Sequence, residues 1–398
     1  MKFYYRLFQM IFRMASYLFN YRRPKLLTGK NSLLNVPVLL QEIRVKQVLI
    51  VTDETIYSLG LIDELLRRLK QDKIQVSLYS KTVPNPTITN VEEALHMYKQ
   101  NHCQAVIAIG GGSPIDCAKA ICARVARPNK TIEDMKGVLK VRKEIPPLIA
   151  IPTTAGTGSE ATLASVISNE ETKEKYALMD HALIPQYAVH DPMLLVNLPP
   201  YITAITGIDT LTHAIEAYIG KSNTKETKQL SEEVVKLVFK YLYVSYQDGE
   251  NIEARERMLE AAYKGGVAFS RAYVGNIHAI AHTLSGFYDT PHGLANAVIL
   301  PYVLEYYGDV VHRQLAKLAD LIEITASQDT AAEKANKFIQ VIRQLNDSMD
   351  IPRKITDIQE EDIPTMIKRA LDEANPLYPV PKIFTEEDMK NIYKKIQT

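Results

Sequence analysis

The sequence predicts an N-terminal α/β domain built on a parallel sheet, followed by an all-α domain. From Lys46 to about Pro199, short apolar runs alternate with helix-like stretches, a pattern typical of a parallel sheet covered by helices. After Pro199 the strand-like runs vanish and helical periodicity takes over. The 398 residues also exceed the roughly 250 to 300 at which one hydrophobic core stops growing, so two domains are expected.

Composition narrows the functional classes. The chain has 47 Lys and Arg against 46 Asp and Glu, a net charge of +1, and no long basic run that would follow a phosphate backbone. Nucleic acid is therefore not an expected partner. Cys103, Cys117 and Cys122 are odd in number and lack a CxxC spacing, which argues against a disulfide framework and a thiolate metal site. This cysteine usage suits a reducing, cytoplasmic location.

Residues 1–27 form a predicted N-terminal extension that contains an amphipathic helix. Its polar residues recur at helical spacing and form a narrow stripe: Lys2, Arg6, Gln9, Arg13, Ser16 and Asn20. The two arginines interrupt the apolar run too often for a membrane span, and no signal-peptide cleavage site follows. The helix would either lie at a membrane surface or pack its apolar face on the protein body or a second subunit. We favour packing, so a membrane is not an expected partner.

The remaining chain divides near Leu198-Pro199-Pro200 into residues 28–198, a nucleotide-binding α/β domain, and residues 199–398, a metal-binding helical domain. In the first part we expect strands at 48–51, 74–79, 105–109 and 147–151, and helices at 60–70, 91–101 and 112–126. In the second part we expect helices at 201–219, 225–247, 251–272, 275–286, 294–306, 309–323, 328–347, 360–374 and 385–396.

A glycine triplet, Gly110, Gly111 and Gly112, directly follows the strand 105–109 and opens a helix. Without side chains there, a pyrophosphate can approach the free amides and the positive end of the helix dipole. Ser113 is expected to cap this helix and Asp116 to supply the acid of a capping box. The alternative is an ordinary tight turn.

Two further features favour nucleotide binding. A second loop rich in small and hydroxyl residues runs over 153–160 and contains Thr153, Thr154, Thr157 and Ser159. The acidic residue that binds the adenosine ribose normally lies about 20 residues after the glycines, but here the candidate, Asp53, precedes them. A different strand order is implied, with Asp53 at the end of an earlier strand. The alternative for Asp53 is a helix cap.

The helical part holds a concentration of metal-binding residue types. His278 and His282 are four residues apart and share a helical face, and His292 follows a turn that allows it to fold back beside them. Asp209 and His213 are also one helical turn apart. Imidazoles with a carboxylate suit iron or zinc better than magnesium or calcium. The alternative is a set of unrelated core or surface histidines.

Four motifs in order resemble those of the iron-containing (group III) alcohol dehydrogenase family, and the likeness runs from about Thr28 onward. They are Gly-Gly-Gly-Ser-Pro-Ile-Asp at 110–116, Pro-Thr-Thr-Ala-Gly-Thr-Gly-Ser-Glu at 152–160, Gly-Ile-Asp-Thr-Leu-Thr-His-Ala-Ile-Glu at 207–216, and residues 278–293. The resemblance implies a Rossmann-like nucleotide-binding domain, a helical domain, NAD, and a divalent metal, Fe²⁺ or alternatively Zn²⁺. We also expect a homodimer.

The resemblance also assigns residues. The metal ligands would be Asp209, His213, His278 and His292. His282 is left outside the ligand set, near the nicotinamide and substrate, where it would transfer a proton or only hydrogen-bond a ligand. Cofactor contacts are expected at Asn85 and Lys175 and at the residues of the two loops.

We therefore expect an oxidoreductase that passes a hydride between NAD(H) and a small primary or secondary alcohol or its carbonyl product. One alternative is a lyase resembling dehydroquinate synthase, which uses NAD transiently, and another is a nucleotide-binding scaffold without turnover. Residues 375–379, Asn-Pro-Leu-Tyr-Pro, replace the Asn-Pro-Arg of many family members. The resemblance therefore leaves the substrate open.

Overall fold

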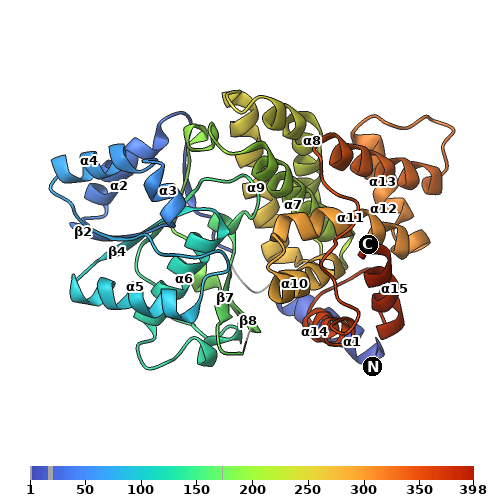
Figure 1. The fold of residues 1–398 in the computed structure, drawn as a ribbon, viewed down its shortest axis with the longest axis horizontal. Helices are drawn as coiled ribbons and strands as arrows, with labels where there is room; N and C mark the ends of the chain where they lie inside the picture. The colour runs from blue at the N-terminus through green and yellow to red at the C-terminus, as the bar shows by residue number, and fades with distance from the viewer. Residues whose placement is uncertain (1, 17–20, 173) are drawn as a thin grey trace. The chain divides into compact units, whose positions relative to one another are not determined.

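A six-stranded parallel sheet forms the centre of the first part of the chain. The computed structural model describes residues 2–16, 21–172 and 174–398 (Figure 1). The strand order is β1-β9-β6-β4-β2-β3, with β1 Lys25–Thr28, β2 Gln47–Val51, β3 Gln75–Tyr79, β4 Ala105–Gly110, β6 Leu148–Pro152 and β9 Tyr187–His190. Because the strands are parallel, their carboxyl ends share one edge of the sheet, where loops after β2, β4 and β6 are brought together.

Helices cover both faces of this sheet, which explains why its central strands are continuously apolar. Figure 1 shows α2 (Val36–Glu42) and α4 (Asp63–Gln71) on one side of β2 and β4, and α5 (Ile88–Gln100) and α6 (Gly112–Ala126) on the other. Every residue of β4 is buried. The predicted α/β class with a parallel sheet is confirmed.

A second, smaller sheet was not predicted from the sequence. It has the order β5-β8-β7, and β7 and β8 are antiparallel. Its strands are β5 Gly137–Val138, β7 Ala164–Asn169 and β8 Glu174–Met179. Strand β1 was also missed and begins inside the segment 1–27 that we assigned to the helical extension. Four residues carry too short a pattern to reveal a strand, and β1 becomes one only by pairing with β9, over 150 residues away.

The rest of the chain is helical. Residues 199–398 form one compact unit with residues 2–16, and the described residues of 21–198 form the other. The helices of the first of these units are α1 Lys2–Ser16, α7 Pro200–Ile219, α8 Lys225–Gln247, α9 Ile252–Ala272, α10 Asn276–Tyr288, α11 His292–Tyr307, α12 His312–Leu321, α13 Ala331–Ser348, α14 Ile363–Ala374 and α15 Glu386–Ile396. The predicted all-α second part is confirmed.

Single turns occupy several connections between these elements. They are α3 Glu54–Ser58 and the 3-10 segments η1 Ser32–Asn35, η2 Glu133–Met135, η3 Ser159–Ala161, η4 His181–Leu183, η5 Pro192–Leu195 and η6 Gly308–Val310. Among the described helices, none combines the length and apolar character needed to cross a bilayer.

The N-terminal helix α1 contacts its own unit through its polar stripe. Arg6 donates hydrogen bonds to the carbonyls of Val380 and Pro381, at 2.7 and 3.0 Å, and Gln9 donates to the carbonyl of Tyr378 at 2.7 Å. Six large apolar side chains are exposed instead: Phe3, Tyr4, Leu7, Met10, Ile11 and Met14. Our expectation that the body of the chain covers this face is therefore wrong for these residues, because the loop 376–381 presents carbonyls that the polar stripe satisfies. The other covering that we expected, a second subunit, stays a prediction. Residues 17–20 of the expected helix lie outside the described residues.

Candidate active site

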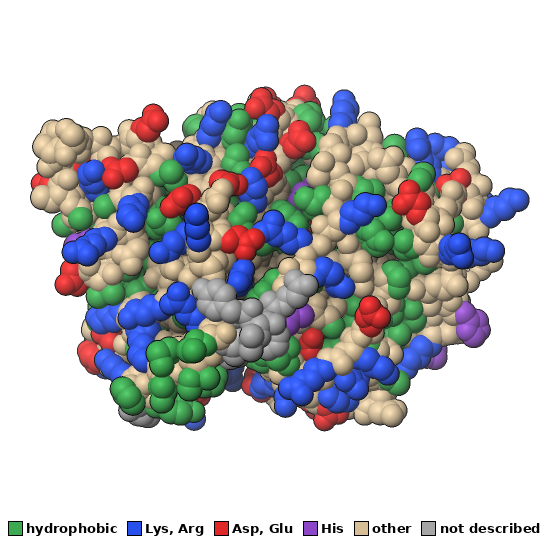
Figure 2. Space-filling view, turned by 180° about the vertical axis from the view of Figure 1, so that it is seen from behind, with side chains coloured by type: hydrophobic (Ala, Val, Ile, Leu, Met, Phe, Trp, Pro, Cys, Tyr) green, Lys and Arg blue, Asp and Glu red, His purple; other side chains and the backbone are tan. Residues whose placement is uncertain are grey.

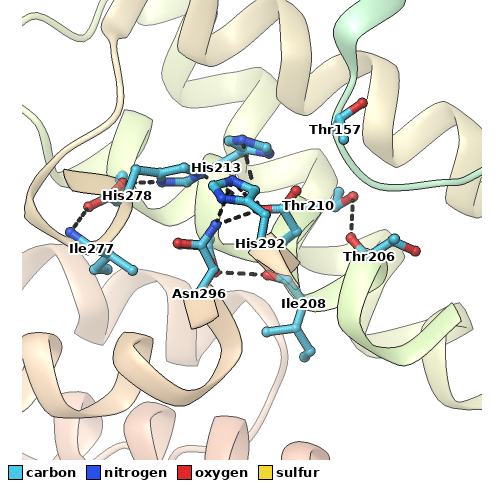
Figure 3. Close-up of polar contacts among 12 residues, drawn as sticks. Thr157, Thr206, Ile208, Thr210, His213, Ile277, His278, His292 and Asn296 are labelled. Carbon is cyan, nitrogen blue, oxygen red and sulfur yellow. Dashed lines mark hydrogen bonds and ion pairs between the residues drawn. The ribbon is translucent and has the colours of Figure 1, made fainter. Parts of the chain in front are cut away.

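Three helices of one unit bring the four expected metal ligands together. Asp209 and His213 lie one turn apart on α7, His278 lies in the first turn of α10, and His292 is the first residue of α11. Figure 3 shows the rings of His213, His278 and His292 gathered around one position. Asp209, His213 and His278 are buried, and His292 is partly exposed.

The distances suit a shared cation better than direct hydrogen bonds. Asp209 Oδ1 lies 3.6 Å from His278 Nε2, 3.7 Å from His292 Nε2 and 4.0 Å from His213 Nε2. These separations exceed hydrogen-bond length. Two ligand atoms each about 2.1 Å from one ion at a tetrahedral angle would lie about 3.4 Å apart. The donor set therefore fits a divalent metal.

A buried ring nitrogen without a partner gives a second indication of a metal. His278 Nε2 has no hydrogen-bond partner among the described residues, although an unpaired buried polar atom is costly. Ligand atoms of Asp209, His278 and His292 lie within 4.8 Å of one another. A bound metal would satisfy the unpaired nitrogen.

Electrostatics prepares these groups for a cation. Burial opposes ionisation of Asp209, but the imidazoles of His213 and His292 hold the pKa of its carboxyl far below the usual range. Burial lowers the pKa of His213 to about 3, which leaves a neutral imidazole able to act as a ligand. Burial also disfavours a charged His278, but Asp209 and Glu216 outweigh it and raise its pKa to about 9. The site thus attracts positive charge.

Glu216 fixes the orientation of His278, and we did not assign it a role from the sequence. Its carboxylate lies 2.6 Å from His278 Nδ1 and accepts the backbone N–H groups of Gly275 and Ile277, each at 2.8 Å. A Cβ on Gly275 would stand 2.7 Å from Glu216 Oε1, so glycine permits the approach. With Nδ1 bonded to the carboxylate, Nε2 is left to face the ligand position.

Asn296 is a further site residue that we missed. It is fully buried one turn after His292, and its Nδ2 donates to Asp209 Oδ1 at 2.7 Å and lies 3.1 Å from His292 Nε2. Figure 3 shows it beside His292. The available signal was a polar residue four positions after an expected ligand, inside an otherwise apolar helix. Its amide helps to hold the Asp209 carboxylate in place.

His282 has a different set of partners. Its Nδ1 lies 2.6 Å from Glu373 Oε1, and Tyr378 Oη donates to the same oxygen at 2.8 Å. The His282 ring stacks on His292 with centroids 5.0 Å apart. The carboxylate bonded at Nδ1 leaves Nε2 as the nitrogen available to a substrate. Glu373 lies 91 residues away in the chain, and no local pattern pointed to it.

The glycine turn of the α/β unit has the expected position after β4, but its capping differs from the prediction. The N-cap of α6 is Gly111, and no side chain caps the helix. The predicted roles of Ser113 as cap and Asp116 as capping-box acid are therefore wrong. Ser113 Oγ instead accepts the Asn85 N–H at 3.2 Å. Since no side-chain oxygen takes the first amides of α6, they are left for an anion.

The second loop packs directly on this turn. A Cβ on Gly112 would stand 2.9 Å from Thr157 Cγ2, and one on Gly111 would stand 3.4 Å from Thr154 Oγ1. Thr153 is buried at the start of the loop, after β6. The structure thus brings the two predicted nucleotide-binding loops into contact.

Asp116 and Ser159 bind each other at the base of these loops. Ser159 Oγ donates to Asp116 Oδ1 at 2.5 Å, and the Val166 N–H donates to Asp116 Oδ2 at 3.0 Å. Lys119, buried in α6, donates to Ser159 Oγ at 3.3 Å and to the Thr162 carbonyl at 2.9 Å. We did not anticipate Lys119. Burial lowers its pKa to about 8.

The other expected cofactor residues lie in the same unit. Lys175 Nζ donates to Asn85 Oδ1 at 2.8 Å, which joins two residues that are distant in sequence. Asp53 follows β2 and caps α3, since its Oδ1 accepts the Ile56 N–H at 2.8 Å. The helix-cap alternative for Asp53 is therefore present in the structure. Because β2 neighbours β4, Asp53 also lies at the sheet edge that carries Gly110.

Comparisons with known proteins agree with this arrangement. Residues 24–192 match the family described as iron-containing alcohol dehydrogenase, and residues 203–397 match the C-terminal part of the Fe-containing alcohol dehydrogenase family. The chain is 36% identical over 373 residues to the NAD-dependent methanol dehydrogenase of Bacillus methanolicus, covering 93% of this chain and 97% of the relative. It is 39% identical over 353 residues to alcohol dehydrogenase 4 of Saccharomyces cerevisiae, covering 88% and 91%.

Solved structures give the same result. A crystal structure of 1,3-propanediol oxidoreductase superimposes with a TM-score of 0.91 at 33% identity, covering 95% of this chain and 99% of that one. Both parts of the chain thus match one family, and the sequence identities of 33 to 39% to these relatives are high enough to show more than a shared fold. The chain belongs to the iron-containing alcohol dehydrogenase family, a family of alcohol oxidoreductases.

Proposed function

We propose that the protein transfers a hydride between NAD(H) and a small alcohol or aldehyde at a metal centre held by Asp209, His213, His278 and His292. One observation carries this proposal: a single buried carboxylate oxygen with three imidazole nitrogens 3.6 to 4.0 Å from it. In this proposal residues 199–398 form the metal-binding domain and residues 28–198 the nucleotide-binding domain.

When bound, the divalent metal supplies Lewis acidity toward the substrate oxygen and the nicotinamide supplies or accepts the hydride. The protein's own residues keep the ligands in place. Glu216 holds His278 with Nε2 directed at the ligand position, and Asn296 holds the carboxylate of Asp209. A ligand set fixed in advance avoids reorganisation during the reaction.

His282 is proposed as the catalytic residue that moves the substrate hydroxyl proton. Its hydrogen bond with Glu373 at Nδ1 fixes the tautomer, so that Nε2 takes the proton during alcohol oxidation and returns it during aldehyde reduction. Tyr378 donates to Glu373 and fixes the position of that carboxylate. Since His282 lies outside the ligand set, its loss would lower the rate without emptying the metal site.

The nucleotide is proposed to bind at the carboxyl edge of the parallel sheet. The pyrophosphate would lie on the amides of Gly110, Gly111, Gly112 and Ser113 at the start of α6. Asp53 would accept the ribose hydroxyls, which favours NAD because the 2′-phosphate of NADP would meet a like charge. The other proposed cofactor contacts are Asn85, Asp116, Thr153, Thr154, Thr157, Ser159 and Lys175.

The substrate is proposed to be a primary alcohol or aldehyde of about one to three carbons. Related proteins are named as methanol, 1,3-propanediol and lactaldehyde enzymes, and they are 33 to 36% identical to this chain. We further propose a cytoplasmic homodimer. The free, buried Cys103, Cys117 and Cys122 are compatible with a reducing compartment.

Purified protein supplied anaerobically with metal and NADH, then tested against a panel of short aldehydes, will test the function. We expect net NADH consumption with at least one aldehyde, whereas a lyase or a scaffold would leave NADH unchanged. Asp209→Asn is the matched inactive control, since it keeps the side-chain shape and removes the ligand charge. Elemental analysis of anaerobically purified protein will distinguish iron from zinc. No NADH consumption across the panel would refute the proposal.

A further inference from the structure

Helix α1 is attached to its unit by its polar side. Besides the bonds of Arg6 and of Gln9 to Tyr378, Gln9 Nε2 donates to the Pro376 carbonyl at 3.2 Å, and Arg13 donates to the Lys221 carbonyl at 3.1 Å. Gln9 is buried by these contacts. Bonds on one side of the helix fix its rotation about its own axis. The opposite, apolar face must therefore point away from the unit.

That face carries large apolar side chains with high exposure. Residues 3, 7, 10 and 14 follow one another at intervals of four, three and four, so they line one side of the helix. The exposed fractions are Phe3 82%, Tyr4 60%, Leu7 40%, Met10 54%, Ile11 57% and Met14 67%. Figure 2 shows hydrophobic side chains gathered at the lower edge where α1 lies. A contiguous apolar surface of this kind marks an interaction site.

The charge of helix α1 indicates which kind of partner its exposed apolar face would bind. Helix α1 itself contains three basic residues, Lys2, Arg6 and Arg13, and no acidic one. The helix that carries the exposed apolar face is thus positively charged. Pairing with a second copy of α1 would place like charges together, whereas an anionic lipid surface is complementary.

We propose that α1 docks the enzyme on the surface of an anionic bilayer. The helix would lie parallel to the surface, with its exposed apolar side chains at the boundary of the acyl chains and Lys2 among the headgroups. The polar stripe would hold the helix to the protein from the other side. This arrangement differs from an amphipathic helix packed on its own protein, in which the apolar face is the buried one.

Co-sedimentation of the full chain with lipid vesicles tests the proposal. We expect at least tenfold tighter binding to vesicles containing phosphatidylglycerol than to vesicles of phosphatidylcholine alone. The triple variant Phe3→Ser, Met10→Ser, Met14→Ser should lose at least tenfold of that binding. Val310→Ser is the matched control, because Val310 is also an exposed apolar residue of the same unit, at 43%, but lies outside α1. It should bind as the wild type does.

A second variant and two physical measurements make the test decisive. Lys2→Glu keeps the apolar face and should weaken binding to anionic vesicles several-fold, most strongly at ionic strengths below about 0.1 M. Unchanged melting temperatures of all variants would show that the fold is intact. Equal binding by the triple variant and the wild type would overturn the proposal. Absence of vesicle binding, together with a dimer that light scattering shows to dissociate in the triple variant, would assign the face to a second copy.

Discussion

Removing the charge of Glu216 should weaken metal binding without changing any ligand. The carboxylate accepts three hydrogen bonds, from His278 Nδ1 and from the N–H groups of Gly275 and Ile277. In Glu216→Gln one acceptor oxygen becomes an NH₂ group, so at least one buried donor faces another donor. An unpaired buried donor costs about 1 to 3 kcal/mol. His278 would lose the bond that directs Nε2 to the metal.

Loss of such a supporting contact typically lowers metal affinity about 10- to 100-fold, equivalent to about 1.4 to 2.7 kcal/mol. Titration of the metal-free protein with Zn²⁺ in the presence of a competing chelator will measure this change directly, independently of turnover. Glu232→Gln is the matched control, since the carboxylate of Glu232 accepts the hydroxyl of Tyr218, which is not one of the proposed metal ligands. Zn²⁺ affinity equal to that of the wild type in Glu216→Gln would refute the assigned role of Glu216.

Three other sets of substitutions test the proposed site and the attachment of α1. His278→Ala and His292→Ala should each lose the metal and all turnover, whereas His282→Ala should retain the metal and lose about 10²- to 10⁴-fold in kcat. Metal content and kcat measured on each variant will test this difference. An empty metal site in His282→Ala would contradict the ligand assignment. Asp53→Gly should raise kcat/KM with NADP relative to NAD by more than about tenfold, because it removes a repulsion of roughly 4 kcal/mol before screening between the carboxylate and the 2′-phosphate. An unchanged ratio of the two kcat/KM values would leave Asp53 only its helix-cap role. Gln9→Ala should lower the free energy of unfolding by about 1 kcal/mol, because the carbonyls of Pro376 and Tyr378 each lose one hydrogen bond while Tyr378 keeps the one from the Val380 N–H. An unchanged chemical denaturation midpoint would show that these bonds of α1 do not stabilise its unit.

Local sequence determined the class of the fold and the residue types of the site. The strands β2, β4 and β6 could be predicted from their apolar runs, because buried parallel strands are apolar on both faces. The glycine triplet could be interpreted as a phosphate-binding turn because it follows such a strand and precedes a helix. Asp209 and His213 are recognisable as a pair because a helix places residues four apart on one face.

Tertiary structure decided which groups support those residues. Glu216 and His278 are 62 positions apart, and His282 and Glu373 are 91 apart, so no helical or strand period links them. The capping of α6 was likewise misjudged, because Asp116 has better partners in Ser159 and Val166 across the fold than in its own helix.

The orientation of α1 shows the same limit. The periodicity of its sequence predicts one polar face and one apolar face, and in most amphipathic helices the apolar face is buried. The carbonyls of the loop 376–381 reversed that outcome, since they offer hydrogen bonds to Arg6 and Gln9. Periodicity therefore defines the faces of a helix, but only the partners that the rest of the chain provides determine which face is buried.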